Sequence, residues 1–236
     1  MEVIPDLKKC KNCNVKNREK ALLICSRCKA VHYCSAECQK KDWKSHKNAC
    51  NYNAKLEEGL KKHENTLGGT IERLTLPDGV SRYELDQRLE KWVKFYSVNL
   101  MAACESGLRL PENIDNALKQ VLYVKLRGRA HPEHRGDVGK LFAVEDAYPL
   151  LIEEAMTWRS PWPESLLQLK DWQDKSGRLG RGRYTAVMVE CPPLAVQTVP
   201  YGSLFPTSFD PVIKPDWKEI LVDDVLHGRQ IIYTKS

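Results

Sequence analysis

Eight side chains near the N-terminus have the types and the spacing of metal ligands. They follow the pattern C-x2-C-x11-C-x2-C-x5-C-x3-C-x7-H-x3-C. Each C-x2-C pair forms a tight turn that directs two sulfurs to one point, and tetrahedral zinc takes four such ligands at about 2.3 Å. Eight ligands make two closed sites with no position left for water, which predicts structural rather than catalytic zinc. The candidates are Cys10, Cys13, Cys25, Cys28, Cys34, Cys38, His46 and Cys50.

The distribution of the nine cysteines favours metal over disulfides. Seven of them fall between Cys10 and Cys50, and the N-terminal run MEVIPDLKKCKNC lacks the apolar core of a signal peptide. We therefore expect an intracellular chain, in the nucleus or the cytoplasm, whose thiols stay reduced and bind metal. The alternative is a chance cluster of buried cysteines. No stretch of about 18 apolar residues is present, so no membrane-spanning helix is expected.

The net charge gives little support to nucleic-acid binding. The formal charge is +6, with every cysteine counted as neutral. Zinc-bound cysteines are thiolates, so seven negative charges against the four positive charges of two Zn²⁺ lower this value to +3. The basic excess is then modest, and a nucleic-acid partner is not expected.

A helix is the element that must position the last ligands. The run SAECQKKDWKSHKNAC begins at Ser35, a favourable N-cap residue, and is rich in helix-forming residues. His46 and Cys50 are four positions apart and share one helical face, with Cys38 on roughly the same stripe. About 50 residues with few large apolar groups cannot offset chain entropy by burial alone. Metal binding would supply the missing stability, on the order of 10 kcal/mol or more per site.

Residues 10–50 resemble the MYND zinc finger at every ligand position. The run VHYCSAECQKKDWKSHK is also similar to the family's YCS-x2-CQ-x2-DW-x2-H core. The resemblance covers about one-sixth of the chain and implies a cross-brace fold with two interleaved structural zinc sites. Cys10, Cys13, Cys34 and Cys38 would hold one Zn²⁺, and Cys25, Cys28, His46 and Cys50 the other. The spacing alone leaves two sequential sites open.

The resemblance also implies a peptide-binding role for three further residues. MYND fingers are mostly protein-interaction modules that bind short proline-containing peptides, often of the P-x-L-x-P type. The peptide lies along a short strand and against a tryptophan on the last helix, and the matching positions here are Ser26, Gln39 and Trp43. An aromatic face suits proline rings, and the two polar side chains can bond a peptide backbone. Alternatively, Trp43 covers the small core and Ser26 shapes the zinc turn.

The rest of the chain predicts a second domain. We expect the finger at 1–52, a short helix and a linker at 53–80, and an α+β domain at 81–236. Helical spacing from Leu85 to Leu100 ends at Gly107, and the other expected helices are 146–158, 164–174 and one from Trp217 to Gly228. The expected strands are 122–126, 141–144, 184–190, 196–199 and 231–233.

Four features of the second domain could carry chemistry, and each has a simpler interpretation. His131 and His134 lie in the run RGRAHPEHRGDVG, which is not an H-E-x-x-H motif and is best interpreted as a solvated loop. The basic run 175–183, KSGRLGRGR, fits neither of the known phosphate-binding glycine patterns. Cys104 and Cys191 are expected to be buried. The run CPPL at 191–194 is similar to the finger's own peptide ligands, or is a turn that ends a strand.

Three classes of function are compatible with these features. The leading one is a zinc-binding adaptor without enzymatic activity, whose finger binds a proline-containing segment of a partner protein. The second is an enzyme with an appended MYND module. A SET-type methyltransferase is disfavoured, since the finger begins at residue 10 and no Asn-His-Ser-Cys type of motif is present. The third is a nucleic-acid-associated regulator, which the corrected charge disfavours.

Overall fold

The computed structural model describes residues 9–13, 15–17, 19–209 and 212–231. These residues form two compact units, one up to Gly69 and one from Thr70 to Ile231. Within the described ranges, no helix combines the length and the apolar character needed to cross a bilayer.

The first unit consists of a two-stranded sheet and one long helix. Strands β1 (Leu23–Ile24) and β2 (His32–Tyr33) are antiparallel, and helix α1 (Ala36–Glu64) follows. Ser35 caps α1 as predicted, because its side chain accepts a hydrogen bond from the backbone of Cys38. The helix continues 14 residues beyond Cys50, so the region expected to be a short helix and a linker holds the second half of α1. It is followed by α2 (Leu67–Arg73) and the 3₁₀ turn η1 (Pro77–Gly79).

The second unit is built on a four-stranded mixed sheet in the order β4-β3-β5-β6. The strands are β3 (Gln120–Gly128), β4 (Phe142–Leu151), β5 (Arg183–Glu190) and β6 (Gln197–Leu204). β3 pairs antiparallel with β4 and parallel with β5, and β5 pairs antiparallel with β6. The helix and sheet domain expected from the sequence is therefore present.

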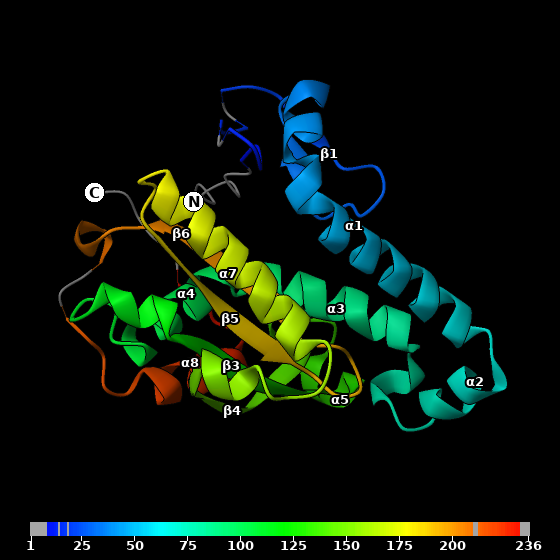
Figure 1. The fold of residues 1–236 in the computed structure, drawn as a ribbon. Coiled ribbons are helices and arrows are strands. Elements are labelled where there is room, and N and C mark those ends of the chain that lie inside the picture. Colours follow the sequence, from blue (N-terminus) through cyan, green and yellow to red (C-terminus); the bar gives the residue numbers. More distant parts are fainter. Residues whose placement is uncertain (1–8, 14, 18, 210–211, 232–236) are drawn as a thin grey trace. The chain divides into compact units, whose positions relative to one another are not determined.

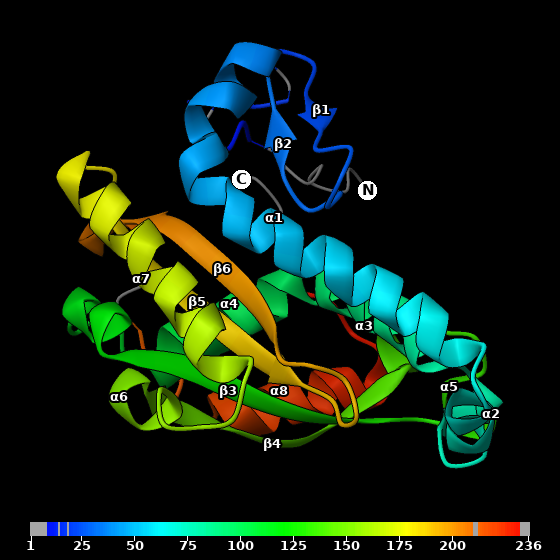
Figure 2. The ribbon, with the colours of Figure 1, turned by 45° about the vertical axis from the view of Figure 1, so that its right-hand side comes forward.

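Both faces of this sheet are covered, which explains the dense apolar run in β3. Leu122, Val124 and Leu126 enter a core that includes residues of α3 (Arg82–Phe95), α4 (Ser97–Gly107) and α8 (Trp217–His227). Val121 and Tyr123 enter a second core with α6 (Ile152–Ala155) and α7 (Trp162–Arg178). Figures 1 and 2 show α7 across one face and α3, α4 and α8 on the other. Short turns complete the unit: η2 (Ile114–Leu118), α5 (His131–His134), η3 (Val138–Lys140) and η4 (Pro206–Ser208).

The single helix predicted from Leu85 through Leu100, with its end at Gly107, is instead two helices, α3 and α4. The break lies at Tyr96, which caps the end of α3 and is fully buried. Its hydroxyl donates to the carbonyl of Gly139, 43 residues away in the chain. A side chain at Gly139 would come within 2.9 Å of the Phe95 ring and 3.0 Å of the Gly228 backbone, so the close packing here favours glycine. A partner so distant in the sequence leaves no mark on the local helical spacing.

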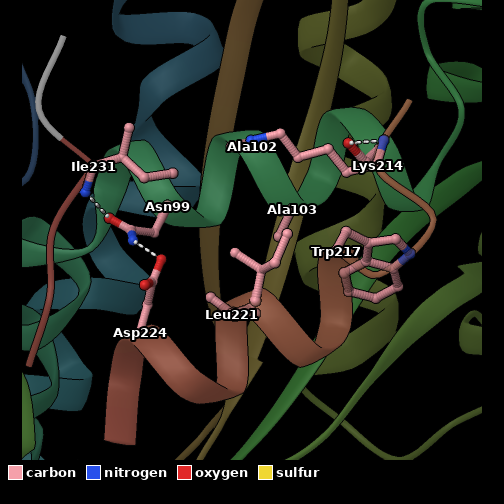
Figure 3. A pocket seen from close by; sticks show the side chains of 10 residues that line it. Asn99, Ala102, Ala103, Lys214, Trp217, Leu221, Asp224 and Ile231 are labelled. Atoms are coloured by element: carbon pink, nitrogen blue, oxygen red, sulfur yellow. Dashed lines mark hydrogen bonds between the residues drawn. The ribbon is translucent and has the colours of Figure 1, made fainter. Parts of the chain in front are cut away.

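Helices α4 and α8 pack together around Asn99 (Figure 3). The Asn99 amide donates to Asp224 at 2.9 Å, and its oxygen accepts from the backbone of Ile231 at 3.1 Å. The pocket beside them measures about 20 Å³, the volume of about one water molecule. α8 ends as predicted at Gly228, which has a left-handed φ of 70°. Ile231 forms no strand, and residues 232 and 233 of the strand predicted there lie outside the described residues.

The helix expected at 146–158 was wrong for its first half. Residues up to Leu151 belong to β4, with Tyr148 opposite Tyr123 and Leu151 opposite Gln120. The spacing of Leu150, Leu151 and Ala155 suits a helix, but Pro149 is unfavourable inside one. Pairing with β3 decides the outcome, and only Ile152–Ala155 forms a helical turn. The strands expected at 122–126 and 184–190 and the helix at 164–174 are confirmed within β3, β5 and α7. The strands expected at 141–144 and 196–199 each begin one residue later than predicted, at the first residues of β4 and β6.

An ionic cluster centred on Asp78 holds the start of the second unit. His134 is buried rather than part of a solvated loop, and its ring Nε2 lies 2.8 Å from Asp78. Its Nδ1 accepts from the backbone of Gly136, so Nε2 carries the proton and donates to the carboxylate. Arg88 also donates to Asp78, at 2.6 Å. Burial alone would raise the pKa of Asp78, but these bonds and the backbone N–H of His131 hold it well below its usual value.

We predict that Asp78→Asn lowers the free energy of unfolding of the second unit by about 2–3 kcal/mol, because Arg88 and His134 lose a charged partner. Urea denaturation of the full chain, followed by tryptophan fluorescence, measures the difference. A carboxyl group whose pKa is lower in the folded than in the unfolded state adds to the free energy of unfolding at pH values above its unfolded pKa. This added stability is lost as the pH falls through the folded pKa. The difference between the variant and the wild type should therefore begin to shrink below about pH 4 and continue to shrink as the pH falls toward the depressed pKa of the folded state.

Glu112→Gln is the control for this prediction, because Glu112 forms an exposed ion pair with Arg109. It should leave the urea midpoint unchanged. An equal loss of stability in both variants, or a difference for Asp78→Asn that does not shrink between about pH 5 and about pH 2, would contradict this role of Asp78.

Candidate metal centre

The eight predicted ligands form two separate groups of four. Within each group, the ligand atoms all lie within 4.8 Å of one another. One group contains Cys10, Cys13, Cys34 and Cys38, and the other contains Cys25, Cys28, His46 and Cys50. The groups interleave along the chain, so the finger is a cross-brace and the sequential alternative does not apply.

Backbone hydrogen bonds shape the turns that present the cysteines. The amide of Cys10 donates to Val15 at 2.8 Å, and the amide of Cys25 donates to Val31 at 2.8 Å. Lys29, directly after Cys28, has a left-handed φ of 53° that closes the second turn. A backbone bridge between Cys10 and His32 brings the first turn beside β2.

Helix α1 contributes ligands to both groups. Cys38 lies in its first turn, while His46 and Cys50 are one turn apart further along. Cys34 lies between β2 and the cap residue Ser35. Both groups therefore depend on the register of one helix.

The separations within the groups fit tetrahedral zinc. With Zn–S near 2.3 Å and Zn–N near 2.0 Å, ligand atoms in a tetrahedron lie about 3.8 Å apart for two sulfurs and about 3.6 Å apart for sulfur and nitrogen. The Sγ atoms of Cys25 and Cys50 are 3.8 Å apart, and Cys28 Sγ lies 3.6 Å from His46 Nε2. In the other group, Cys34 Sγ is 3.5 Å from both Cys13 Sγ and Cys38 Sγ. Each group can thus hold one structural zinc ion.

The two groups differ in their access to solvent. Every ligand of the Cys25 group is buried. In the Cys10 group only Cys10 is buried, while Cys13 is exposed and Cys34 and Cys38 are half-buried. We therefore expect reagents to reach Cys13, Cys34 and Cys38, though not Cys10, without unfolding the Cys25 group.

Each group contains one thiol whose pKa is lowered and at least one whose pKa is raised. Burial raises the pKa of Cys10, but the backbone N–H groups of Cys13 and Cys34 outweigh this effect and lower it to about 6. Burial also raises the pKa of Cys25, and hydrogen bonds led by the backbone of Cys28 lower it to about 6. Hydrogen bonding to Cys38 raises the pKa of Cys34 to about 12, and burial raises that of Cys50 to about 12. Zinc supplies the positive charge that lets all the thiolates form together.

Polar residues that the spacing of the ligands did not single out support both groups. Asn12 Nδ2 donates to Cys38 Sγ at 3.4 Å. Tyr33, buried in the finger core, donates to Asp42 at 2.8 Å, which joins β2 to α1. Only the position of Asp42 beside Trp43 in the YCS-x2-CQ-x2-DW core could have indicated it. Nothing in the sequence pattern indicates Asn12, because its partner Cys38 lies 26 residues away in the chain.

Two of the three predicted peptide contacts share a surface pocket. Gln39 and Trp43 line it together with Ala36 and Lys40, and its volume is about 300 Å³. Trp43 is 38% exposed and touches His46 edge-on at 6.1 Å between ring centroids. Ser26 is exposed in the zinc turn and does not line this pocket.

The second unit places none of its candidate residues in a metal group. Among the described residues, only the two groups of the finger bring three or more potential ligands together. Cys104 and Cys191 are fully buried, as predicted. Leu194 of the CPPL run is also buried in the core, so its side chain is not available as a peptide ligand.

We predict that partial chelation exposes the thiols of the Cys10 group first. Cys13, Cys34 and Cys38 should be alkylated at least about tenfold faster than Cys25, Cys28 and Cys50, because these three residues are exposed or half-buried and the other three are buried. Mass spectrometry of peptides, after iodoacetamide treatment at rising chelator concentration, measures the order. Cys104 and Cys191 serve as internal controls that should react only on unfolding. Equal rates in both groups would refute the difference in access.

Comparisons with known proteins agree with this geometry. Residues 10–50 match the MYND finger family model. The zinc finger MYND domain-containing protein 10 homolog of Drosophila melanogaster is 49% identical over 41 residues, which are 17% of this chain and 8% of that protein. Deformed epidermal autoregulatory factor 1 of Drosophila melanogaster is 48% identical over 46 residues, 20% of this chain and 7% of the relative.

These similarities are confined to the finger. The chain spans less than a tenth of the length of either relative, and no solved structure matches it. The family match, the curated relatives and the two groups of ligands all coincide on one segment. Residues 10–50 of this chain are therefore a MYND finger, a protein-interaction module with two zinc sites.

Proposed function

We propose that the finger binds an extended, proline-containing segment of a partner protein and that the chain acts as an adaptor. The observation that carries this proposal is the pocket in which Trp43 and Gln39 lie together. The indole of Trp43 offers a flat apolar surface that suits a proline ring, and the Gln39 amide can bond a peptide backbone. Such a peptide is already extended, so little entropy is lost when it binds.

The free edge of β1 supports the same mode of binding. β1 pairs only with β2 among the described strands, and its two side chains are exposed, Leu23 by 65% and Ile24 by 49%. The next residue, Cys25, contacts Gln39 of the pocket. An extended peptide has no internal hydrogen bonds and can use both the strand edge and the pocket.

In this proposal the second unit serves as a docking platform rather than a catalytic domain. Its sheet is covered on both faces by apolar packing. Its pocket between α4 and α8 has room for about one water molecule, far less than the several hundred Å³ of a ligand site. The second contact would therefore lie on its outer surface.

We predict that Trp43→Ala weakens binding of a fluorescein-labelled peptide with a Pro-x-Leu-x-Pro core at least about tenfold. A tenfold loss corresponds to about 1.4 kcal/mol, within the range of a tryptophan that anchors an interface. Fluorescence anisotropy with the full, zinc-loaded chain measures it.

Tyr52→Ala is the matched control. Tyr52 lies on the same helix, is 42% exposed and does not line the pocket, so its variant should bind like the wild type. No binding of the peptide by the wild type, or the same loss in both variants, would contradict the proposal.

A further inference from the structure

The side chain of Gln39 connects the buried zinc group to the pocket. Its Nε2 lies 3.8 Å from Cys25 Sγ, one of the four buried ligands. The same side chain lines the pocket beside Trp43. Because Gln39 and Trp43 are four positions apart on α1, they face the same side of the helix.

The chemistry of a zinc-bound thiolate determines which end of the amide faces the sulfur. A thiolate carries no proton and can only accept a hydrogen bond. The Nε2 group of Gln39 must therefore face Cys25, since the opposite orientation would place the amide oxygen against a negative sulfur. This removes the twofold choice that a glutamine side chain otherwise has.

We infer that Gln39 is a positioning residue that supports the buried zinc site through Cys25 and is itself oriented by that bond. One N–H is used by the sulfur, so the oxygen and the second N–H remain for a ligand. A peptide backbone offers a complementary pair, one N–H donor and one C=O acceptor per residue. The buried zinc site thereby fixes which side of the Gln39 amide accepts from a bound peptide and which side donates to it. The peptide part of this inference rests on the proposed function, whereas the zinc part does not.

Asn12 provides a built-in comparison. It donates to a zinc-ligand sulfur of the other group, Cys38, at 3.4 Å. It does not line the pocket. Loss of the Asn12 donor should therefore weaken one zinc site and leave peptide binding unchanged when zinc is in excess.

The decisive experiment compares zinc affinity in Gln39→Glu, Gln39→Met and Asn12→Asp by competition with a chromophoric chelator. Loss of a hydrogen bond to a ligand costs about 10–100-fold in metal affinity. Gln39→Glu should show the largest loss of zinc affinity at the buried site, because it also places a negative charge beside the Cys25 thiolate. Gln39→Met keeps the size of the side chain and should lose less. Alkylation mapping assigns each loss to Cys25 and its group or to Cys38 and its group.

Three further readouts separate the inference from the proposed function. In cadmium-substituted protein, NMR should show a coupling between the metal and one side-chain amide proton of Gln39. With excess zinc, both Gln39 variants should bind the Pro-x-Leu-x-Pro peptide at least about tenfold more weakly, while Asn12→Asp should bind it normally. Trp43→Ala should lose the peptide and lose less zinc affinity than Gln39→Glu, because Trp43 packs against His46 without a hydrogen bond to a ligand sulfur.

Each outcome has a distinct meaning. Zinc affinity that is unchanged in both Gln39 variants would overturn the inference. Weaker zinc binding with unchanged peptide binding would overturn the assigned orientation of the amide in the pocket. If the wild type does not bind the peptide, the proposed function fails, and the zinc affinities and the cadmium coupling still decide the role of Gln39.

Discussion

The crossed ligation of two metal sites is the constraint on which the finger depends. Its buried core consists of Cys10, Cys25, Cys28, Cys50 and Tyr33, so four of the five members are themselves ligands. Tyr33 is the one large apolar side chain in this set, and so small a core cannot offset the entropy of about 40 ordered residues. Zinc replaces apolar packing here, and the cross-brace lets each ion join segments that are far apart in the chain.

Helix α1 links the two zinc groups to the surface pocket. It carries ligands of both groups and also the pocket residues Gln39 and Trp43. Because a helix is rigid over a few turns, fixing its register at Cys38, His46 and Cys50 also fixes the positions of the pocket side chains. Trp43 touches His46 and Gln39 contacts Cys25, so each pocket residue rests on a ligand of the buried group. The pocket is thus held by the residues of the zinc site rather than by a separate apolar core.

The second unit is stabilised in a different way. Its sheet buries alternate residues on opposite faces, and two apolar cores replace the metal ions as the source of stability. Polar contacts fix the segments that connect these elements. Tyr96 bonds Gly139 at the break between α3 and α4, and Asp78 bonds His134. Loss of zinc should therefore affect the two units unequally, because only the finger has ligands in its core.

Residue types and their spacing were sufficient to predict the finger, because ligand patterns are local and tetrahedral zinc accepts few arrangements. They were also sufficient for most strands, whose dense apolar runs need a partner on each face, and for the caps at Ser35 and Gly228. The spacing of the ligands left their pairing open, and the interleaved groups were implied only by the resemblance to the MYND family. Three features emerged only once the chain was folded: the contacts of Gln39 and Asn12 with sulfur, the break at Tyr96 and the strand from Asp146 to Leu151. Each of these depends on a partner distant in the chain, and no local pattern of residue types records such a partner.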